Sequence, residues 1–345
     1  MALPRPFKLL AAELERSSRA VVPILGSGFV TQAAFSGAAL FPPARGEKSP
    51  APVDWISLLK GVASEFECGS ATSHIHADVP GQTTLLWDAM VAELAGRPTA
   101  DVSARGARKA AHVWESKMRR SVARRLREDV ATVERSRPFV ESFLRLGWDD
   151  VLSFNFDSVL LPPKVRPVHL ELGAAKRASL VASVGKTRVW YPHGHLSEPD
   201  SIVLGAHAYG VRIAAMQAAF EKHARLAAPR PTQDFSSWVA LLLERPLLFV
   251  GLSLTREEWT LWWLLSQRAR FLARRPVRVE GALVRNARPG AYVFARRPAS
   301  SDRLEAHAAF QTLSRACDLL GLTLLSFDDF ATGWKSLRSA LGWPE

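Results

Sequence analysis

Four short segments, far apart in this chain, each change abruptly from an apolar run to glycine, serine, asparagine, aspartate or histidine. They are residues 24–28 (ILGSG), 152–157 (LSFNFD), 191–195 (YPHGH) and 249–253 (FVGLS). Such a change is typical of the carboxyl end of a buried strand in a parallel α/β sheet, which is where ligands bind. The four segments therefore predict one crevice lined by polar groups from four strands.

Strand-like and helical patterns alternate along the rest of the chain, which implies parallel pairing and a doubly wound sheet. We expect an α/β protein with a Rossmann-like, mainly parallel sheet, forming a single domain over residues 1–345. Residues 84–146 have a helical pattern throughout and contain no cofactor motif. They are predicted to form a helical insertion packed on the sheet.

Composition restricts the class and the environment of the protein. An apolar fraction of 48% is ample for a buried core. The two cysteines, Cys68 and Cys317, have no CxxC partner, so a disulfide framework and a four-cysteine zinc site are excluded by counting. The N-terminus lacks a signal-peptide pattern, and the apolar stretch 238–254 is interrupted by charges and a proline. We expect a cytoplasmic protein with no membrane contact.

The formal net charge is +12, from 45 Lys and Arg against 33 Asp and Glu. A surplus of this size is compatible with a polyanionic partner such as nucleic acid. No aromatic residues alternate with the arginine clusters, as a platform for single strands would require. A diffuse basic surface is the favoured interpretation, and a nucleic-acid or acidic-protein partner is the alternative.

Gly26, Ser27 and Gly28 directly follow an apolar run, which is typical of a turn that holds a phosphate. Glycine allows close backbone approach, and the start of the next helix offers free N–H groups to an anion. The full GxGxxG pattern is absent because position 31 is Thr. A tight turn without a ligand therefore remains the alternative.

Asn155 and Asp157 follow the strand that ends near Phe154, and alternation would put both on one face. Two polar side chains at the carboxyl end of a strand favour a site. In the alternative interpretation, Asp157 or Ser158 caps the next helix and Asn155 satisfies backbone groups.

His193 is the candidate general base, because histidine titrates near neutral pH. Gly194 would let a substrate approach the backbone, and His195 is a secondary lining residue. The His-x-His pair also raises the possibility of a metal-dependent hydrolase, but a third ligand with suitable spacing is missing. Ser253 either contacts a ribose or phosphate, or caps the following helix.

Together these segments resemble the sirtuin-type (SIR2-like) NAD-binding fold, and more closely the SIR2-like NAD-cleaving domains of bacterial anti-phage defence systems. The family pattern is G-[AS]-G, then T-x-N-[YF]-D, then H-G, then F-[VI]-G-x-S-L. This chain has the same motifs in the same order, at residues 26–28, 153–157, 193–194 and 249–254.

The chain departs from the family pattern at three positions: Ser153 replaces Thr, His195 stands where Ser or Asp is common, and Arg256 stands where Asp is common. It also lacks the zinc-binding cysteine pairs of the protein-deacylating sirtuins. The resemblance therefore implies NAD binding without acyl-lysine chemistry and without a metal.

The resemblance also implies roles for individual residues. Asn155 would position the ribose and a water, Asp157 would orient Asn155 or the ribose, and His193 would act as the base. The pyrophosphate would lie on the turn at residues 26–28. The expected cofactor-binding set is Gly26, Ser27, Gly28, Phe29, Gly194, Gly251 and Ser253.

The resulting prediction is an NAD+ hydrolase that cleaves the nicotinamide–ribose bond and depletes NAD as an anti-phage effector. Because an unregulated hydrolase would kill its host, we expect control by homo-oligomerisation or by a separate sensor protein, with nucleic acid as a ligand of that partner. The alternative is a non-catalytic module that binds NAD or ADP-ribose and has a basic partner-binding surface. The two differ in whether Asn155 and His193 face one pocket.

Overall fold

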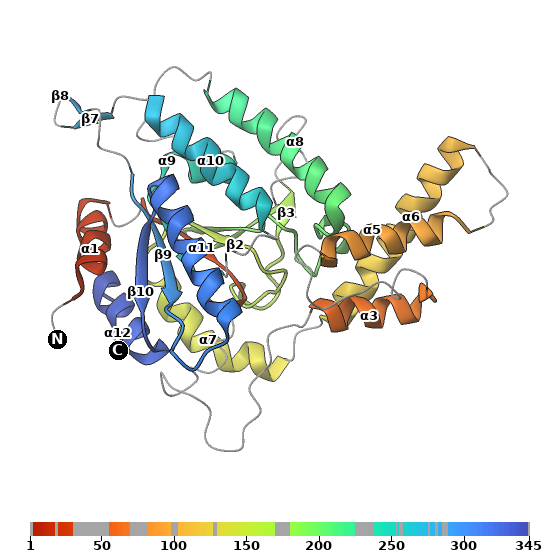
Figure 1. Ribbon diagram of the computed structural model, residues 1–345, viewed down its shortest axis with the longest axis horizontal. Helices are drawn as coiled ribbons and strands as arrows, with labels where there is room; N and C mark the ends of the chain where they lie inside the picture. The colour runs from red at the N-terminus through yellow and green to blue at the C-terminus, as the bar shows by residue number, and fades with distance from the viewer. Residues whose placement is uncertain are drawn as a thin grey trace.

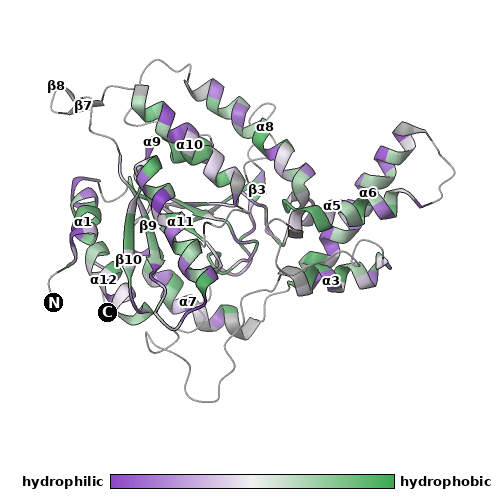
Figure 2. Ribbon diagram, in the orientation of Figure 1, coloured by the Kyte–Doolittle hydropathy of each residue, from purple (hydrophilic) through white to green (hydrophobic). Residues whose placement is uncertain are grey.

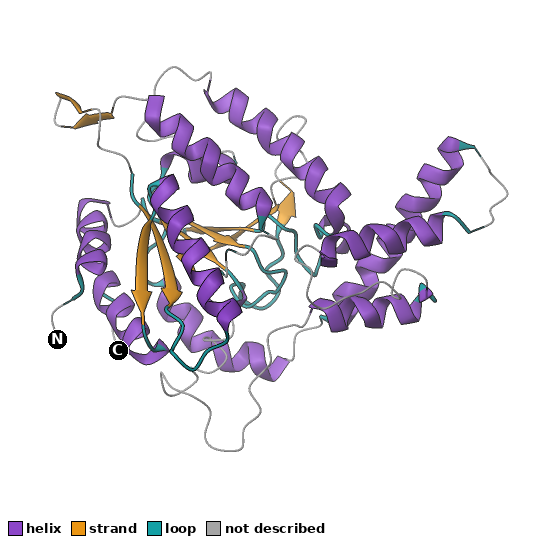
Figure 3. Cartoon of the chain, viewed as in Figure 1, coloured by secondary structure: helices purple, strands orange, loops and turns teal. Residues whose placement is uncertain are grey.

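Eight strands form one mostly parallel sheet, in the order β10-β9-β6-β1-β2-β5-β4-β3. The structure is a computed structural model, and it describes residues 3–17, 20–29, 55–69, 82–97, 103–126, 130–169, 180–224, 237–252, 254, 258–274, 277–279, 282–284 and 289–343. The parallel strands are β1 (Val22–Leu25), β2 (Asp150–Ser153), β5 (Thr187–Trp190), β6 (Leu247–Val250), β9 (Ala291–Arg296) and β10 (Thr323–Phe327). The strands lie between helices in Figure 3.

Apolar side chains along each central strand alternate between two separate cores. Leu25 belongs to one core and Ile24 to the other, and Val151 and Leu152 divide in the same way. A strand buried on both faces is expected to be a continuous apolar run, which explains why these segments are so short and hydrophobic.

Helices cover both faces of the sheet. One core contains side chains of α1 (Arg5–Ser17), α7 (Val130–Leu144) and α12 (Phe330–Leu341). The other core contains side chains of α8 (Gly205–Ala224), α9 (Trp238–Glu244), α10 (Trp259–Arg274) and α11 (Leu304–Leu320). Figure 1 shows α1 and α12 side by side, and α8 and α10 on the other side of the strands. The predicted α/β, Rossmann-like fold is confirmed.

The sheet is mixed at one edge, which the sequence pattern did not indicate. Strands β3 (Val168–His169) and β4 (Leu180–Val184) are antiparallel, and β4 pairs with β5. Only two residues separate β4 from β5, and the first of them, Gly185, has φ +62. A hairpin this tight needs no helix between its strands, so the alternation rule does not apply there. A second hairpin joins β7 (Val277–Val279) to β8 (Ala282–Val284).

A group of helices that we call the helical lobe packs beside the sheet (Figure 1). It consists of α3 (Trp55–Glu65), α5 (Gln82–Ala95) and α6 (Ala104–Arg125), which share one apolar cluster. The expected insertion over 84–146 differs from this grouping, because α7 packs on the sheet through Phe139 and Phe143, and α3 joins the lobe.

Glu65 links two helices of the lobe. Its carboxylate accepts a hydrogen bond from the Ser121 hydroxyl (2.6 Å) and forms ion pairs with Arg124 and Arg125 on α6. These hydrogen bonds, that of Ser121 first, lower the pKa of Glu65 to about 2. The carboxylate therefore stays charged at neutral pH and joins α3 to α6.

The two cysteines form no disulfide in the part of the chain that the structure describes, and they lie in different apolar clusters, Cys68 in the lobe and Cys317 on α11. Burial raises the pKa of both thiols, that of Cys317 to about 11. Neither is therefore a thiolate at neutral pH. Among the helices that the structure describes, none has the length and hydrophobicity needed to cross a membrane.

Candidate functional site

The four segments identified in the sequence follow four adjacent parallel strands, β6, β1, β2 and β5. Hydrogen bonds continue the sheet into their ends: Phe154 N–H donates to the Leu25 carbonyl (2.9 Å), and Gly26 N–H donates to the Val250 carbonyl (3.0 Å). Because the strands are parallel, all four carboxyl ends open at the same edge. The chain goes from β1 to β2 on one side and later returns to β6 on the other, which makes β1 the topological switch point where ligands bind.

A buried network holds β2 and β5 in register. The Asp150 carboxylate accepts two hydrogen bonds from Arg188 (2.8 and 3.0 Å) and one from the Trp190 indole (2.8 Å). Asp150 and Arg188 are also directly paired in the sheet. The positions that follow these strands, Asn155 and His193, are thereby held on neighbouring strand ends.

The Gly26–Gly28 turn packs backbone to backbone against the turn at Gly251. Gly28 N–H donates to the Gly251 carbonyl (3.0 Å), and residues 27–29 are helical, as predicted for a strand-to-helix turn. A Cβ on Gly26 would lie 2.5 Å from the Gly251 oxygen, and one on Gly251 would lie 2.1 Å from the Phe29 nitrogen. Only glycine therefore fits at these positions, because the two turns pack backbone to backbone, whether or not a ligand also contacts them.

Phe29, expected among the cofactor-binding residues, has a side chain that is fully buried in the core. Its ring contacts Phe139 and Phe143, at centroid distances of 5.5 and 4.9 Å. Its N–H donates to the Gly26 carbonyl (3.0 Å). In this structure Phe29 anchors the start of the helix that follows β1, and its ring does not line the strand-end edge.

Asn155 has a buried amide nitrogen, Nδ2, with no hydrogen-bond partner among the residues that the structure describes. Its backbone N–H donates to the Ser153 hydroxyl (3.3 Å). A buried amide donor without a partner is costly and calls for an explanation, such as a ligand that accepts the bond. The structure thus presents one N–H donor at the end of β2.

Asp157 uses one carboxylate oxygen, Oδ1, to accept the Val159 N–H (3.1 Å). This bond closes a local turn, and the described residues 157–169 contain no helix for Asp157 to cap, so the helix-capping alternative is wrong. Phe154 and Phe156, expected on one face, belong to different apolar clusters, because the chain leaves the extended conformation after Ser153. Asp157 therefore stabilises the loop that carries Asn155.

His193 is 6% exposed, and its ring makes no hydrogen bond in the described part of the chain. It packs between two aromatic rings, Phe154 at 4.8 Å and Tyr209 of α8 at 5.6 Å between centroids. Burial, together with the nearby charge of Arg212, lowers the pKa of His193 to about 3. The imidazole is therefore neutral at pH 7 and has a free lone pair.

His195 is completely buried, and both of its ring nitrogens are within hydrogen-bonding distance of partners. Nδ1 accepts the Ser197 N–H (3.1 Å), so the proton is on Nε2, which lies 3.3 Å from the Ser158 hydroxyl. The ring is also hydrogen-bonded to the Asp157 backbone, and burial lowers the pKa of His195 to about 4. His195 thus joins its own loop to the loop of Asn155. The sequence predicted a residue that lines the site, whereas this position stabilises the loop structure.

The His-x-His pair does not form a ligand set in this structure. The ring of His193 lies against Phe154 and Tyr209, whereas the ring of His195 lies against Tyr191, at 4.7 Å, and its nitrogens are engaged. Within the described ranges, no group of three His, Cys, Asp or Glu side chains is placed to hold a metal ion. The geometry does not favour the metal-dependent alternative.

Gly194 has φ +96, and a Cβ there would lie 2.3 Å from the Ser201 carbonyl oxygen. The sequence suggested that this glycine lets a substrate approach the backbone. Instead, the chain itself occupies that side, through Ser201 and Ile202. The expected contact with Ser253, like the departure at Arg256, lies outside the described residues.

Residues near His193 that the sequence analysis missed come from helices. Tyr209 and Arg212 lie one turn apart on α8, and Arg119 of α6 lowers the pKa of Arg212 further, after burial, to about 10. Arg119 also reaches the Asp200 carbonyl (3.4 Å), in the loop that follows His193. No motif marks these residues, because their placement depends on how the lobe and α8 pack beside the sheet.

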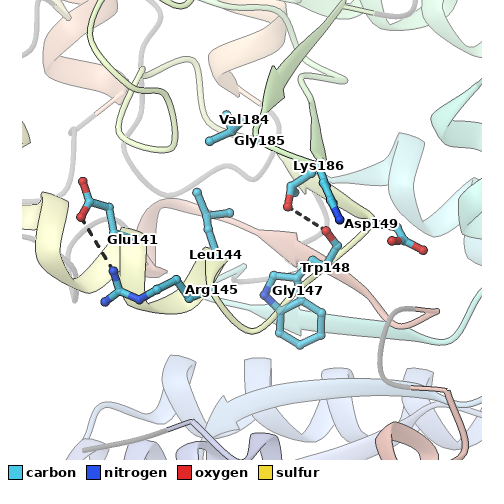
Figure 4. A pocket seen from close by; sticks show the side chains of 10 residues that line it. Glu141, Leu144, Arg145, Gly147, Trp148, Asp149, Val184, Gly185 and Lys186 are labelled. Carbon is cyan, nitrogen blue, oxygen red and sulfur yellow. Dashed lines mark hydrogen bonds and ion pairs between the residues drawn. The ribbon is translucent and has the colours of Figure 1, made fainter.

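An open pocket of about 410 Å³ lies elsewhere, at the amino ends of β2 and β5 (Figure 4). Its walls are held by the hydrogen bond from the Thr187 hydroxyl to the Trp148 carbonyl (2.7 Å). It contains none of the predicted site residues. We place the candidate site at the carboxyl edge of the sheet. Asn155, with a buried donor that has no partner among the described residues, and His193, with its lowered pKa, both lie there. The pocket is lined by Glu141, Leu144, Arg145, Gly147, Trp148, Asp149, Val184, Gly185, Lys186 and Thr187.

The fold and the strand-end groups define a Rossmann-like α/β protein with a candidate ligand site at the switch point. Residues 149–312 match the family model of the SIR2-like domain. The match includes Asn155, His193 and Gly251, whereas the Gly26–Gly28 turn precedes it. Among curated proteins, no match to the chain was found.

The low pKa values of His193 and His195 predict a loss of stability in acid. Both imidazoles are neutral in the folded state, but each takes up a proton near pH 6.5 in the unfolded chain. Between the folded values and pH 6.5 the unfolded state binds more protons, so the free energy of unfolding falls as pH falls. The expected slope is up to about 1.4 kcal/mol per pH unit for each histidine.

Urea unfolding of the wild type and of His193→Gln, between about pH 5 and 6.5, measures this slope. His193→Gln should lower it by up to about 1.4 kcal/mol per pH unit, the full amount being approached near pH 5. His112→Gln, at an exposed position on α6, is the control for the loss of one histidine. Equal slopes in all three proteins would contradict the assignment.

Proposed function

We propose that this protein is an NAD+ hydrolase that cleaves the nicotinamide–ribose bond. Two independent findings support the proposal: the match of residues 149–312 to the SIR2-like domain, which suggests NAD-related activity, and the polar strand ends at the switch point. The observation that carries it furthest is the buried Asn155 Nδ2 without a partner among the described residues, next to the strand end that carries His193.

In the proposed reaction, water attacks the anomeric carbon of the nicotinamide ribose. A bond forms between the water oxygen and this carbon, and the carbon–nitrogen bond to nicotinamide breaks. Nicotinamide leaves with the bonding electron pair as a neutral base, and the water loses one proton. The ribose passes through an oxocarbenium-like state, which nearby oxygen dipoles stabilise.

Asn155 supplies the donor for a ribose hydroxyl in this scheme. An amide N–H whose partner arrives with the ligand holds that hydroxyl at a defined place, and the bond satisfies a buried donor that has no partner among the described residues. Asp157 acts on Asn155 indirectly, because its carboxylate holds the loop through the Val159 N–H.

His193 is the proposed base toward the attacking water or a ribose hydroxyl. Its neutral imidazole is in the form that accepts a proton at pH 7. A pKa of about 3 makes it a weak base before the substrate binds, so the proton transfer depends on the acidity that the water gains as its oxygen bonds to the cationic anomeric carbon.

The second candidate is a module that binds NAD or ADP-ribose without cleaving it. The observation that favours this function is the burial of His193 between Phe154 and Tyr209, close to the charge of Arg212. In that case Asn155 would still bind a ribose, and His193 would serve as packing.

Incubation of the purified protein with a fluorogenic NAD analogue distinguishes the two, and the assay should include the product of any neighbouring gene. Turnover is expected, together with release of nicotinamide. Binding measured by calorimetry without turnover under any condition would establish the non-catalytic module instead. A chelator should leave the rate unchanged, whereas a metal-dependent hydrolase would lose activity.

The biological setting that we propose, an anti-phage effector held inactive until triggered by oligomerisation or a sensor protein, rests on the sequence resemblance. In infected cells that express the chain, the NAD concentration should fall. In cells that express Asn155→Ala it should stay constant. Size-exclusion chromatography before and after activation would identify a change of oligomeric state.

A further inference from the structure

Helix α6 carries eight Lys or Arg residues and one Glu within 22 residues. Three of the basic residues, Arg119, Arg124 and Arg125, are accounted for by ion pairs with Glu115 or Glu65. The other five are exposed and form no ion pair among the described residues. They are Arg105, Arg108, Lys109, Lys117 and Arg120.

The unpaired charges are concentrated in the first half of α6. Arg105, Arg108, Lys109 and His112 follow one another at intervals of three or four residues, or are direct neighbours, so they lie on one face of the helix. Figure 1 shows that this end of α6 extends outward from the lobe, and Figure 2 shows hydrophilic bands along it. We call these four residues the α6 basic face.

The α6 basic face is electrostatically unfavourable in the protein by itself. Like charges at these intervals repel one another. They also lie near the start of the helix, where the backbone dipole is positive and the first turn contains no acidic residue. An anion bound there would remove both costs.

We propose that the α6 basic face binds the phosphate backbone of a nucleic acid. Arg105, Arg108 and Lys109 are exposed cations on one face of α6, and phosphates are the groups on a nucleic acid that such cations neutralise. The aromatic side chain closest in sequence, Trp114, is turned toward Phe66, at 6.2 Å between centroids, and Lys117 lies over its ring. The face therefore offers charge without a stacking platform, which favours backbone contacts on a duplex over base recognition.

Helix α6 carries the α6 basic face and also contacts the loop of the candidate site. About one to two turns beyond His112, the same helix contacts Asp200 through the Ser116 hydroxyl (2.7 Å) and through Arg119 (3.4 Å). Asp200 belongs to the loop that follows His193. A nucleic acid on α6 therefore lies on the helix that also contacts the His193 loop.

Fluorescence anisotropy with a labelled duplex DNA of random sequence tests the proposal, at salt concentrations from about 50 to 200 mM. With three phosphate contacts, the logarithm of the affinity should fall with the logarithm of salt at a slope of about −2.7. The triple variant Arg105→Glu, Arg108→Glu, Lys109→Glu should bind at least about tenfold more weakly at the lowest salt and with almost no salt dependence. Acidic residues at a helix start are favourable, so this variant is expected to fold.

The matched control is Arg303→Glu, Arg315→Glu, Lys335→Glu, which reverses three exposed charges elsewhere and changes the net charge equally. It should bind within about twofold of the wild type. Equal weakening in both triple variants would mean a general charge effect and would overturn the proposal. If the wild type binds a poly-Glu peptide as tightly as it binds the duplex, the proposal is also overturned, and the partner is identified as an acidic protein.

If circular dichroism shows that the glutamate variant is unfolded, the glutamine variant at the same three positions replaces it. It should weaken duplex binding in the same direction and reduce the salt slope by about 2.7. An unchanged slope in a folded glutamine variant would overturn the proposal. Because the readout is binding, the result does not depend on whether the protein cleaves NAD.

Discussion

Asn155→Ala is expected to lower kcat/KM for NAD+ cleavage by about 10²- to 10³-fold, an effect comparable with removal of one positioned hydrogen-bond donor from other active sites. The substitution removes the Nδ2 group that is buried and without a partner among the described residues. Since that donor makes no hydrogen bond to the described residues, stability should not fall with activity. Steady-state kinetics and thermal unfolding of the same preparation measure both.

Asn155→Asp is the control for the chemical identity of this donor. It keeps the size of the side chain but replaces the N–H donor by an acceptor, so it should lose as much activity as alanine. Wild-type rates in Asn155→Asp would contradict the proposed role of Nδ2.

A matched pair of histidine variants separates catalysis from loop structure. His193→Gln should reduce kcat by about 10²- to 10⁴-fold, the range typical of a general base. His195→Gln should act chiefly through the free energy of unfolding, because His195 joins its loop to Ser158 and to the Asp157 backbone. A larger loss of kcat in folded His195→Gln than in His193→Gln would reverse these two roles.

The second large effect is expected at Gly251, where alanine should destabilise the fold by about 2–5 kcal/mol. One part is the positive φ of +70, which costs an L-residue about 1–2 kcal/mol. The other part is overpacking, typically about 1–3 kcal/mol, because the new Cβ would lie 2.1 Å from the Phe29 nitrogen. Urea unfolding measures the change.

Gly321→Ala is the control for this prediction. Gly321 ends α11 with φ +69, but a Cβ there would meet no atom within 4 Å among the described residues. It should therefore show the conformational cost of about 1 kcal/mol without the overpacking cost. If both variants lose equal stability, the contact between the Gly26–Gly28 turn and the Gly251 turn adds nothing to the free energy of unfolding.

Much of the fold could be predicted from the sequence because its signals are local. Val22–Leu25 and Leu247–Val250 are short, continuous apolar runs, and only a strand buried on both faces explains such runs followed directly by glycine. The β4–β5 hairpin was missed, because its turn, Gly185-Lys186, is not one of the Asn-Gly or Asp-Gly pairs that mark a hairpin most strongly.

For the candidate site, the sequence indicated which residues gather at the strand ends but did not indicate their contacts. The side chains of Asn155 and Asp157 have similar positions in their motif, yet one has a donor without a partner among the described residues and the other accepts the Val159 N–H. His193 and His195 are likewise equivalent by pattern. Only the neighbours provided by Tyr209, Ser158 and Ser197 distinguish them.

The sequence by itself determined that this chain folds as a doubly wound α/β protein and that four polar strand ends open at one edge, because apolar runs and glycines constrain the backbone locally. Tertiary structure alone decided the rest: the packing of the Gly26 turn against the Gly251 turn, the neutral state of His193, and the contact of α6 with the His193 loop through Ser116. Each of these depends on groups far apart in the chain, whose separation, burial and electrostatic interaction exist only once the elements have packed.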